Sequence, residues 1–145
     1  MHRRNSERGS ALIETAIAVP ILLLLTVGIF EVGRAYQTWQ VVTNAAREGA
    51  RASITPSAND TTTEALVKQY MSDGQLNNAS TAVVDVDRNA VITVNGVDFG
   101  ASQVTVDYPF EFIILQPVAR LVSPTTTAGE DFTMRATSLM RNEAQ

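Results

Sequence analysis

The sequence predicts an α+β fold in which a long N-terminal helix packs on a small antiparallel sheet with a second, short helix. The run Thr15–Phe30 contains no charged residue, which is typical of a helix in an apolar environment. After residue 82 the apolar residues recur with a period of two, which is typical of strands that bury one face. Helical and strand patterns are thus segregated along the chain, as in α+β domains.

The apolar run predicts one membrane span, over about residues 12–30. The 21 residues from Ser10 to Phe30 carry a single charge, that of Glu14. As a helix they would rise roughly 31 Å, about the thickness of a hydrocarbon core. The residues before them carry a net positive charge, from Arg3, Arg4, Arg8 and Glu7. By the positive-inside rule, the N-terminus stays in the cytoplasm and the rest of the chain lies outside.

Three outcomes are open to such a segment: a cleaved secretory signal, a permanent anchor, or a processed helix. A secretory signal has a shorter apolar region that ends at a site of the form small-x-small. The nearest such site here, Gly33-x-Ala35, has charged residues at and around it, which argues against secretory cleavage.

Glu14 distinguishes the remaining two outcomes. A carboxylate within an apolar span opposes insertion, so a simple anchor has no reason to carry it. If the chain is cut between Gly9 and Ser10, Glu14 becomes the fifth residue and can pair with the α-amino group of a neighbouring helix. The alternative is that Glu14 reaches the headgroups near the membrane edge.

The segment from Arg8 to Glu14 reads RGSALIE, and with the apolar run after it resembles the class III signal of type IV pilins and pseudopilins. The resemblance implies that a prepilin peptidase cuts after Gly9, leaving Ser10 as the new N-terminus, and that Glu14 directs assembly. It also implies a pilin-like fold.

Further motifs narrow the resemblance. They are Val19–Pro20, the block Ala45–Arg51 (AAREGAR) and the ending Thr137–Glu143. With them the chain is similar to the TadE-like minor pilins of bacterial tight-adherence (Tad/Flp, type IVb) systems. Cleavage would leave 136 residues, whereas major Flp pilins are very short, so the resemblance implies a minor pilin.

The resemblance implies a subunit of the inner membrane that contributes to pilus assembly, with its head outside the cytoplasm. The expected partners are the membrane, a prepilin peptidase, other pilins and the Tad inner-membrane assembly proteins. The expected regions are a leader over 1–9, a long helix over 10–55 and a head domain over 56–145. The alternative is a permanently anchored envelope protein whose extracytoplasmic head binds a partner or ligand.

The composition argues against other classes of function. Eleven Lys and Arg against fifteen Asp and Glu give a net charge of −4, whereas a nucleic-acid-binding surface is basic. The chain has no cysteine, and its single histidine is His2. Thiolate chemistry, Ser-His-Asp catalysis and His-rich metal sites are therefore not expected. Asp85, Asp87 and Asp98 lack the pattern of a calcium loop. We expect no enzyme activity, no metal and no cofactor.

Beyond the membrane, a helical face of mostly small residues continues to Pro56, where a stop is expected. Its members are Val32, Ala35, Trp39, Val42, Ala46, Gly49 and Ser53. Inside the span, Pro20 predicts a bend or local melting near Ala16, because it removes a backbone hydrogen bond.

Five residues of this second half are candidates for contacts between subunits or between helix and head. They are Trp39, Arg47, Glu48, Gly49 and Arg51. The alternative for the Arg-Glu-Gly-Ala-Arg block is a solvated, amphipathic helix end.

The head is expected to begin with a short helix that starts at a Thr61–Glu64 capping box and ends at Gly74. Strand patterns follow over 82–87, 91–94, 103–108 and 132–137. Turns are expected at Arg88–Asn89 and at Asn95–Gly96. Residues 110–115 (FEFIIL) are either a continuation of a core strand or a loop packed on the helix, and 123–129 is expected to be a flexible loop.

Overall fold

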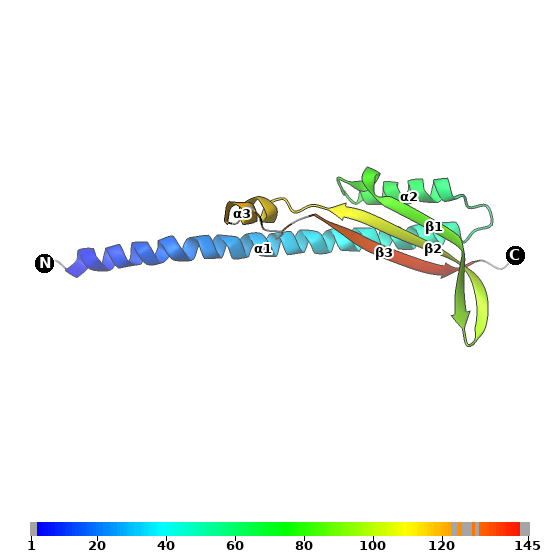
Figure 1. Ribbon diagram of the computed structural model, residues 1–145, viewed down its shortest axis with the longest axis horizontal. Helices are drawn as coiled ribbons and strands as arrows, with labels where there is room; N and C mark the ends of the chain where they lie inside the picture. Colours follow the sequence, from blue (N-terminus) through cyan, green and yellow to red (C-terminus); the bar gives the residue numbers. More distant parts are fainter. Residues whose placement is uncertain (1–2, 123–124, 126–128, 130, 143–145) are drawn as a thin grey trace. The chain divides into compact units, whose positions relative to one another are not determined.

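The computed structural model describes residues 3–122, 125, 129 and 131–142 (Figure 1). The helices are α1 (Arg3–Ser53), α2 (Asp60–Asp73) and α3 (Leu115–Val122), with one 3₁₀ turn at Ala79–Thr81. The strands β1 (Val83–Val94), β2 (Val97–Phe110) and β3 (Phe132–Arg141) form an antiparallel sheet in the order β1–β2–β3. The predicted α+β class is confirmed.

The chain divides into two compact units. One consists of Met1–Arg34 and Phe112–Gly129, and the other of Ala35–Glu111 and Glu130–Gln145. The first half of α1 and α3 therefore belong to one unit. The second half of α1, α2 and the sheet belong to the other.

The helix α1 is continuous through the predicted membrane span. Its 51 residues are helical throughout, including Ala16 and Pro20, so melting near Ala16 is not observed. The hydroxyls of Thr15 and Thr26 donate to carbonyl oxygens four residues earlier, at 2.8 Å in both cases. These bonds satisfy two polar side chains within the helix itself, as an apolar environment requires. A bend at Pro20 stays a prediction.

The second half of α1 contributes to the core of the sheet unit. Val42, Ala45 and Ala50 are fully buried there. They share the core with Val67 and Met71 of α2 and with Val104 and Val106 of β2. The predicted small-residue face is confirmed at Val42, Ala46, Gly49 and Ser53. Val32 and Trp39, of the same predicted face, are 68% and 41% exposed.

The helix α2 differs from its prediction at the start. Asn59 is its N-cap, because the Asn59 side chain accepts the backbone N–H of Thr61 at 2.8 Å. The predicted Thr61–Glu64 capping box is therefore wrong, and Glu64 pairs with Lys68 at 2.8 Å instead.

The predicted end of α2 at Gly74 is confirmed. A Cβ at Gly74 would lie 2.5 Å from a methyl carbon of Val41, so only glycine permits this approach to α1. Of the apolar residues of α2, Val67 and Met71 are buried, whereas Leu66 and Tyr70 are exposed.

The strands β1 and β2 form a hairpin whose turn is the predicted Asn95–Gly96. Both residues have positive φ, 53° and 78°, as a two-residue hairpin turn of this kind requires. The predicted turn at Arg88–Asn89 is wrong, because β1 continues through it with a bulge between Asp87 and Ala90. The cause is tertiary: Arg88 donates to the carbonyl oxygens of Ala58 and Thr55 at 2.6 and 3.2 Å.

The strand β2 pairs with β3 along its second half. Val104, Val106 and Tyr108 are buried, which confirms the predicted alternation. On the other face, Arg135 donates two hydrogen bonds to Asp107, both at 2.7 Å. The Arg135 guanidinium holds the pKa of the Asp107 carboxyl below its usual value.

The apolar stretch 110–115 contains a helix start that the sequence analysis did not predict. Phe110 ends β2 and is buried, residues 111–114 connect, and Leu115 begins α3. Of the loop expected over 123–129, only Thr125 and Gly129 lie among the described residues.

The burial of α1 in the sheet unit predicts how fragments of the chain behave. A fragment that starts at Tyr36 should fold with a cooperative thermal transition, because it keeps Val42, Ala45 and Ala50. A fragment that starts at Ser57 should be unfolded or aggregated, because it loses these core residues. Circular dichroism and size-exclusion chromatography compare the two, and a folded, monodisperse fragment from Ser57 onward would contradict this role of α1.

Candidate functional site

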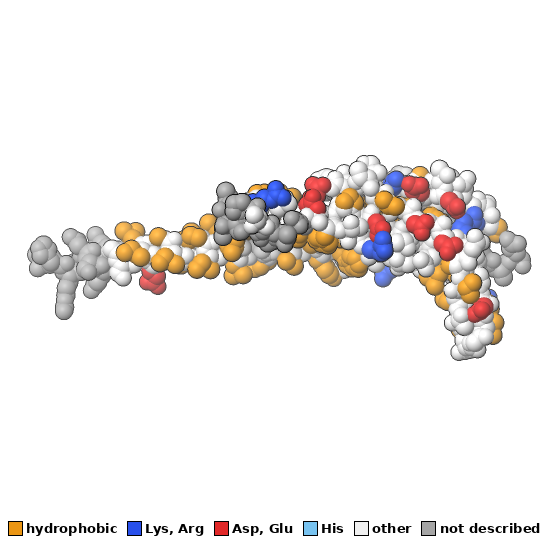
Figure 2. All heavy atoms as spheres, viewed as in Figure 1, with side chains coloured by type: hydrophobic (Ala, Val, Ile, Leu, Met, Phe, Trp, Pro, Cys, Tyr) orange, Lys and Arg blue, Asp and Glu red, His pale blue; other side chains and the backbone are white. Residues whose placement is uncertain are grey.

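The first half of α1 presents an apolar surface that is largely exposed in the described part of the chain. Its large apolar side chains are exposed: Leu12, Ile13, Ile17, Val19, Ile21, Leu22, Leu23, Leu24, Leu25, Ile29 and Phe30. Figure 2 shows this apolar surface along the N-terminal part of α1. Among the described residues, α1 is the one helix long and apolar enough to cross a membrane. An apolar surface of this length must meet lipid or other protein chains.

The predicted processing site lies at the start of this surface. Gly9 and Ser10 are both helical and exposed, and a Cβ placed on Gly9 would meet no atom within 4 Å. Glu14 is exposed one turn further along. Among the described side chains, none forms an ion pair with Glu14. Its carboxylate therefore needs a partner from outside the described chain if this turn lies in lipid.

A second carboxylate lies at the other end of the apolar run, and the chain satisfies it internally. Glu31 is fully buried. One of its oxygens accepts the backbone N–H groups of Ile113 and Ile114, at 2.9 and 2.6 Å. The other oxygen pairs with the guanidinium of Arg34 at 2.9 Å. The two N–H groups lie just before α3, at a helix start, where backbone N–H groups have no acceptor within the helix. Glu31 thus caps α3.

Glu31 is a functional residue that the sequence pattern does not predict. It lies 82 residues before Ile113 and is joined to it only by the fold. One signal was present: an acidic residue directly after an uncharged run, three residues before Arg34. This spacing places the two side chains on the same face of a helix.

The helix α3 lies against the end of the apolar run (Figure 1). Leu115 and one side of α1 line a groove of about 660 Å³, and the α1 members are Ile21, Leu24, Leu25, Gly28, Ile29 and Val32. Val118 donates its backbone N–H to the carbonyl oxygen of Ile114 at 3.1 Å, which continues the first turn. Gly129 returns to this turn, and a Cβ there would lie 2.8 Å from the Gln116 nitrogen. No side chain that lines the groove is charged or polar.

Gly49, one of the candidate contact residues, lies inside the sheet unit. A Cβ on Gly49 would lie 2.5 Å from a methyl carbon of Val67 and 3.2 Å from one of Val104. Glycine therefore lets α2 and β2 approach α1 at this position. Any larger side chain would push these elements apart.

The other four candidate contact residues lie at or near the surface of α1. Trp39, Arg47 and Arg51 are exposed, and Glu48 is partly exposed. Glu48 pairs with Arg51 at 2.5 Å, and Arg47 donates to Asn44 at 3.4 Å. The structure does not place these four residues with Gly49 in one contact, and their role between subunits stays a prediction.

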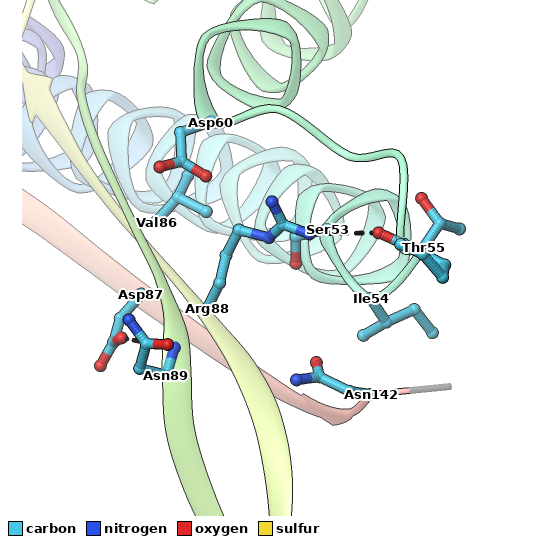
Figure 3. A pocket seen from close by; sticks show the side chains of 10 residues that line it. Ser53, Ile54, Thr55, Asp60, Val86, Asp87, Arg88, Asn89 and Asn142 are labelled. Atoms are coloured by element: carbon cyan, nitrogen blue, oxygen red, sulfur yellow. Dashed lines mark hydrogen bonds between the residues drawn. The ribbon is translucent and has the colours of Figure 1, made fainter. Parts of the chain in front are cut away.

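The sheet unit also holds a polar pocket of about 420 Å³ near the end of α1 (Figure 3). Asp60, Asp87 and Arg88 line it, together with Asn89 and Asn142. The Arg88 guanidinium holds the loop between α1 and α2 through its two bonds to backbone carbonyl oxygens. In the described ranges, no three acidic, histidine or cysteine side chains gather closely enough to hold a metal ion. Arg88, the basic residue of the pocket, thus has a structural role in holding this loop.

The comparison with known protein families bears on the helix α1. Residues 9–51 match the family model described as TadE-like protein. This segment is similar to the TadE-like family. The match includes Gly9, Glu14, the apolar run and the Ala45–Arg51 block, so the resemblance seen in the sequence is confirmed. It indicates a protein associated with a Tad pilus. No curated protein and no solved structure matches the chain.

The capping role of Glu31 predicts a local effect of its removal. Glu31→Ala should speed amide hydrogen exchange of Ile113, Ile114 and α3 by at least about tenfold, because a hydrogen bond to a charged group is worth about 1.5–3 kcal/mol. The measurement is exchange mass spectrometry of the full chain in detergent.

Glu48→Ala is the matched control for this experiment. Glu48 also pairs with an arginine three residues later on α1, but no backbone N–H donor of another segment is recorded for it among the described residues. It should leave exchange in α3 unchanged. Equal exchange in α3 for wild type and Glu31→Ala would contradict the capping role.

Proposed function

We propose that the protein is a non-enzymatic minor pilin of a Tad/Flp, type IVb pilus, processed by a prepilin peptidase after Gly9. The TadE-like match over residues 9–51 supports this proposal, because it covers the processing site, Glu14 and the apolar run in one segment. The uninterrupted helix α1 supports it further, since it carries all three on one rigid element.

The observation that carries the proposal is the contrast between Glu14 and Glu31. Both carboxylates lie at or near an end of the same apolar run. Glu31 is buried and satisfied by two backbone N–H groups and Arg34. Glu14 is exposed on an apolar surface, with no ion pair to a described side chain. A carboxylate placed in this way is stabilised by a cation from another molecule once it enters lipid.

Processing after Gly9 would create that cation. The new α-amino group of Ser10 is positive at neutral pH. Ser10 and Glu14 are four residues apart on α1, which corresponds to an axial rise of about 6 Å. When the amine of one subunit pairs with Glu14 of the next, neighbouring helices are offset by about this distance. The pair thus neutralises two charges in lipid and sets the axial register of assembly.

The remaining parts of the chain take the following roles in this proposal. The residues 1–9 stay in the cytoplasm until they are removed, α1 spans the inner membrane over about 12–30, and the head lies outside. The partners are a prepilin peptidase, other pilins and the Tad inner-membrane assembly proteins. Trp39, Arg47, Glu48 and Arg51 are exposed or partly exposed, and in this proposal they contact neighbouring subunits. A bend at Pro20 would help α1 to pack in a filament.

The proposal predicts the N-terminus of the mature protein. In cells that hold the peptidase, intact-mass and N-terminal peptide analysis should find a chain that begins at Ser10. In matched cells without the peptidase, the chain should retain residues 1–9. An intact Met1 in both strains would contradict processing and would favour the permanently anchored envelope protein.

A second prediction concerns the Glu14 pair. Glu14→Gln keeps the shape of the side chain but removes its charge, so the chain should still insert and be cleaved. Its incorporation into filaments should fall more than about tenfold, because an uncompensated buried charge costs about 3–5 kcal/mol. Immunoblots of sheared filaments and membranes measure both. Glu64→Gln, at a partly exposed position of α2, is the control, and unchanged incorporation of Glu14→Gln would contradict the pairing.

A further inference from the structure

We infer that the segment Phe112–Arg120 is a second membrane contact of this protein, and that it lies in the lipid interface where α1 leaves the bilayer. The inference rests on the proposed span of α1 over about residues 12–30. It goes beyond the pilin proposal, which concerns the other end of the span. The lipid-facing part is the connection before α3, together with the first turn of α3.

The start of α3 lies beside the last turns of the proposed span. Leu115 lines the apolar groove with residues from Ile21 to Val32. Most of these belong to the last turns of the proposed span, so Leu115 lies at the depth of the outer hydrocarbon boundary. Lipid is the neighbour that this depth supplies, because the spanning turns of α1 are surrounded by acyl chains on every side that protein does not cover.

Glu31 satisfies two backbone N–H groups at the start of α3. A helix start in an apolar environment leaves N–H groups without partners, and each such group is costly there. The N–H groups of Ile113 and Ile114 are bonded to Glu31, which is itself neutralised by Arg34. The chain can therefore place the start of α3 at the membrane edge without an unpaired donor at these two positions.

The segment Phe112–Arg120 is mostly apolar and ends in a basic residue. Ile113 is 60% exposed although it lies between two N–H groups fixed to α1, so the fold holds an apolar side chain outward at this depth. The α3 sequence, LQPVARLV, holds one charged residue, Arg120, which is exposed. An apolar stretch followed by a basic residue is the composition of a segment that lies in the interface, with the guanidinium among lipid phosphates.

The test measures the depth of spin labels in the full chain, reconstituted in vesicles of phosphatidylethanolamine and phosphatidylglycerol. Because the chain has no cysteine, single labels can be placed without removing native thiols. The probe is Ile113→Cys. Leu23→Cys, at a site 61% exposed and outside the groove, reports the span. Val97→Cys, at a site 55% exposed beside the hairpin turn, reports water. Power saturation compares collisions with oxygen, which concentrates in lipid, and with a nickel chelate, which stays in water.

The inference predicts an oxygen-to-nickel ratio for Ile113→Cys several-fold above that of Val97→Cys and towards that of Leu23→Cys. A ratio equal to that of Val97→Cys, with Leu23→Cys still in lipid, would overturn the inference and leave the span intact. Water-like ratios at both Leu23→Cys and Ile113→Cys would instead overturn the span, and with it the membrane part of the proposed function. Low access to both reagents at Ile113→Cys would show that protein, such as a second copy, covers the segment, and would also overturn the inference.

A second variant tests the cause. Adding Glu31→Ala to Ile113→Cys removes the bonds that hold the segment to α1, so the ratio at Ile113→Cys should fall towards that of Val97→Cys. The ratio at Leu23→Cys should not change. A ratio at Ile113→Cys that is unaffected by Glu31→Ala would contradict the role of Glu31 in holding this segment at the membrane.

Discussion

The hydrogen bonds from Ile113 and Ile114 to Glu31 join two parts of the chain that are far apart in sequence, and much of the first unit depends on them. They bring α3 to the end of the apolar run of α1, and they use a carboxylate to satisfy donors that would be unpaired near lipid. Glu14, near the other end of the same run, has no ion pair to a described side chain. Within the chain, Arg34 neutralises the carboxylate of Glu31 at one end of the run. In our proposal, a second molecule neutralises the carboxylate of Glu14 at the other end.

The two halves of α1 meet different surroundings, and their residues differ accordingly. The first half carries large aliphatic side chains that are exposed, as suits contact with lipid or with other helices. The second half buries small residues such as Ala45, Gly49 and Ala50, which let α2 and β2 approach the helix backbone. The two halves of α1 thus belong to different compact units and carry different kinds of residue.

Features whose cause is local could be predicted from the sequence, and features whose cause is distant could not. The span, the Asn95–Gly96 turn and the alternation of Val104 and Val106 follow from neighbouring residues alone. The bulge at Arg88–Asn89 could not be predicted, because Arg88 is held by carbonyl oxygens about 30 residues earlier. The capping of α3 by Glu31 could not be predicted for the same reason. In α2 the N-cap is Asn59 and not the predicted Thr61, because the Asn59 side chain accepts the Thr61 N–H.

The most direct test of this account is the distance between the Ser10 amine and a glutamate carboxyl in assembled filaments. Filaments are assembled from this protein with ¹⁵N in serine and from its partner pilins with ¹³C in the glutamate side-chain carboxyls. Solid-state NMR then detects contacts only between different molecules. The account predicts that the ¹⁵N signal of the terminal amine dephases against one carboxyl within about 4 Å. A terminal amine with no carboxyl carbon near it would contradict the account.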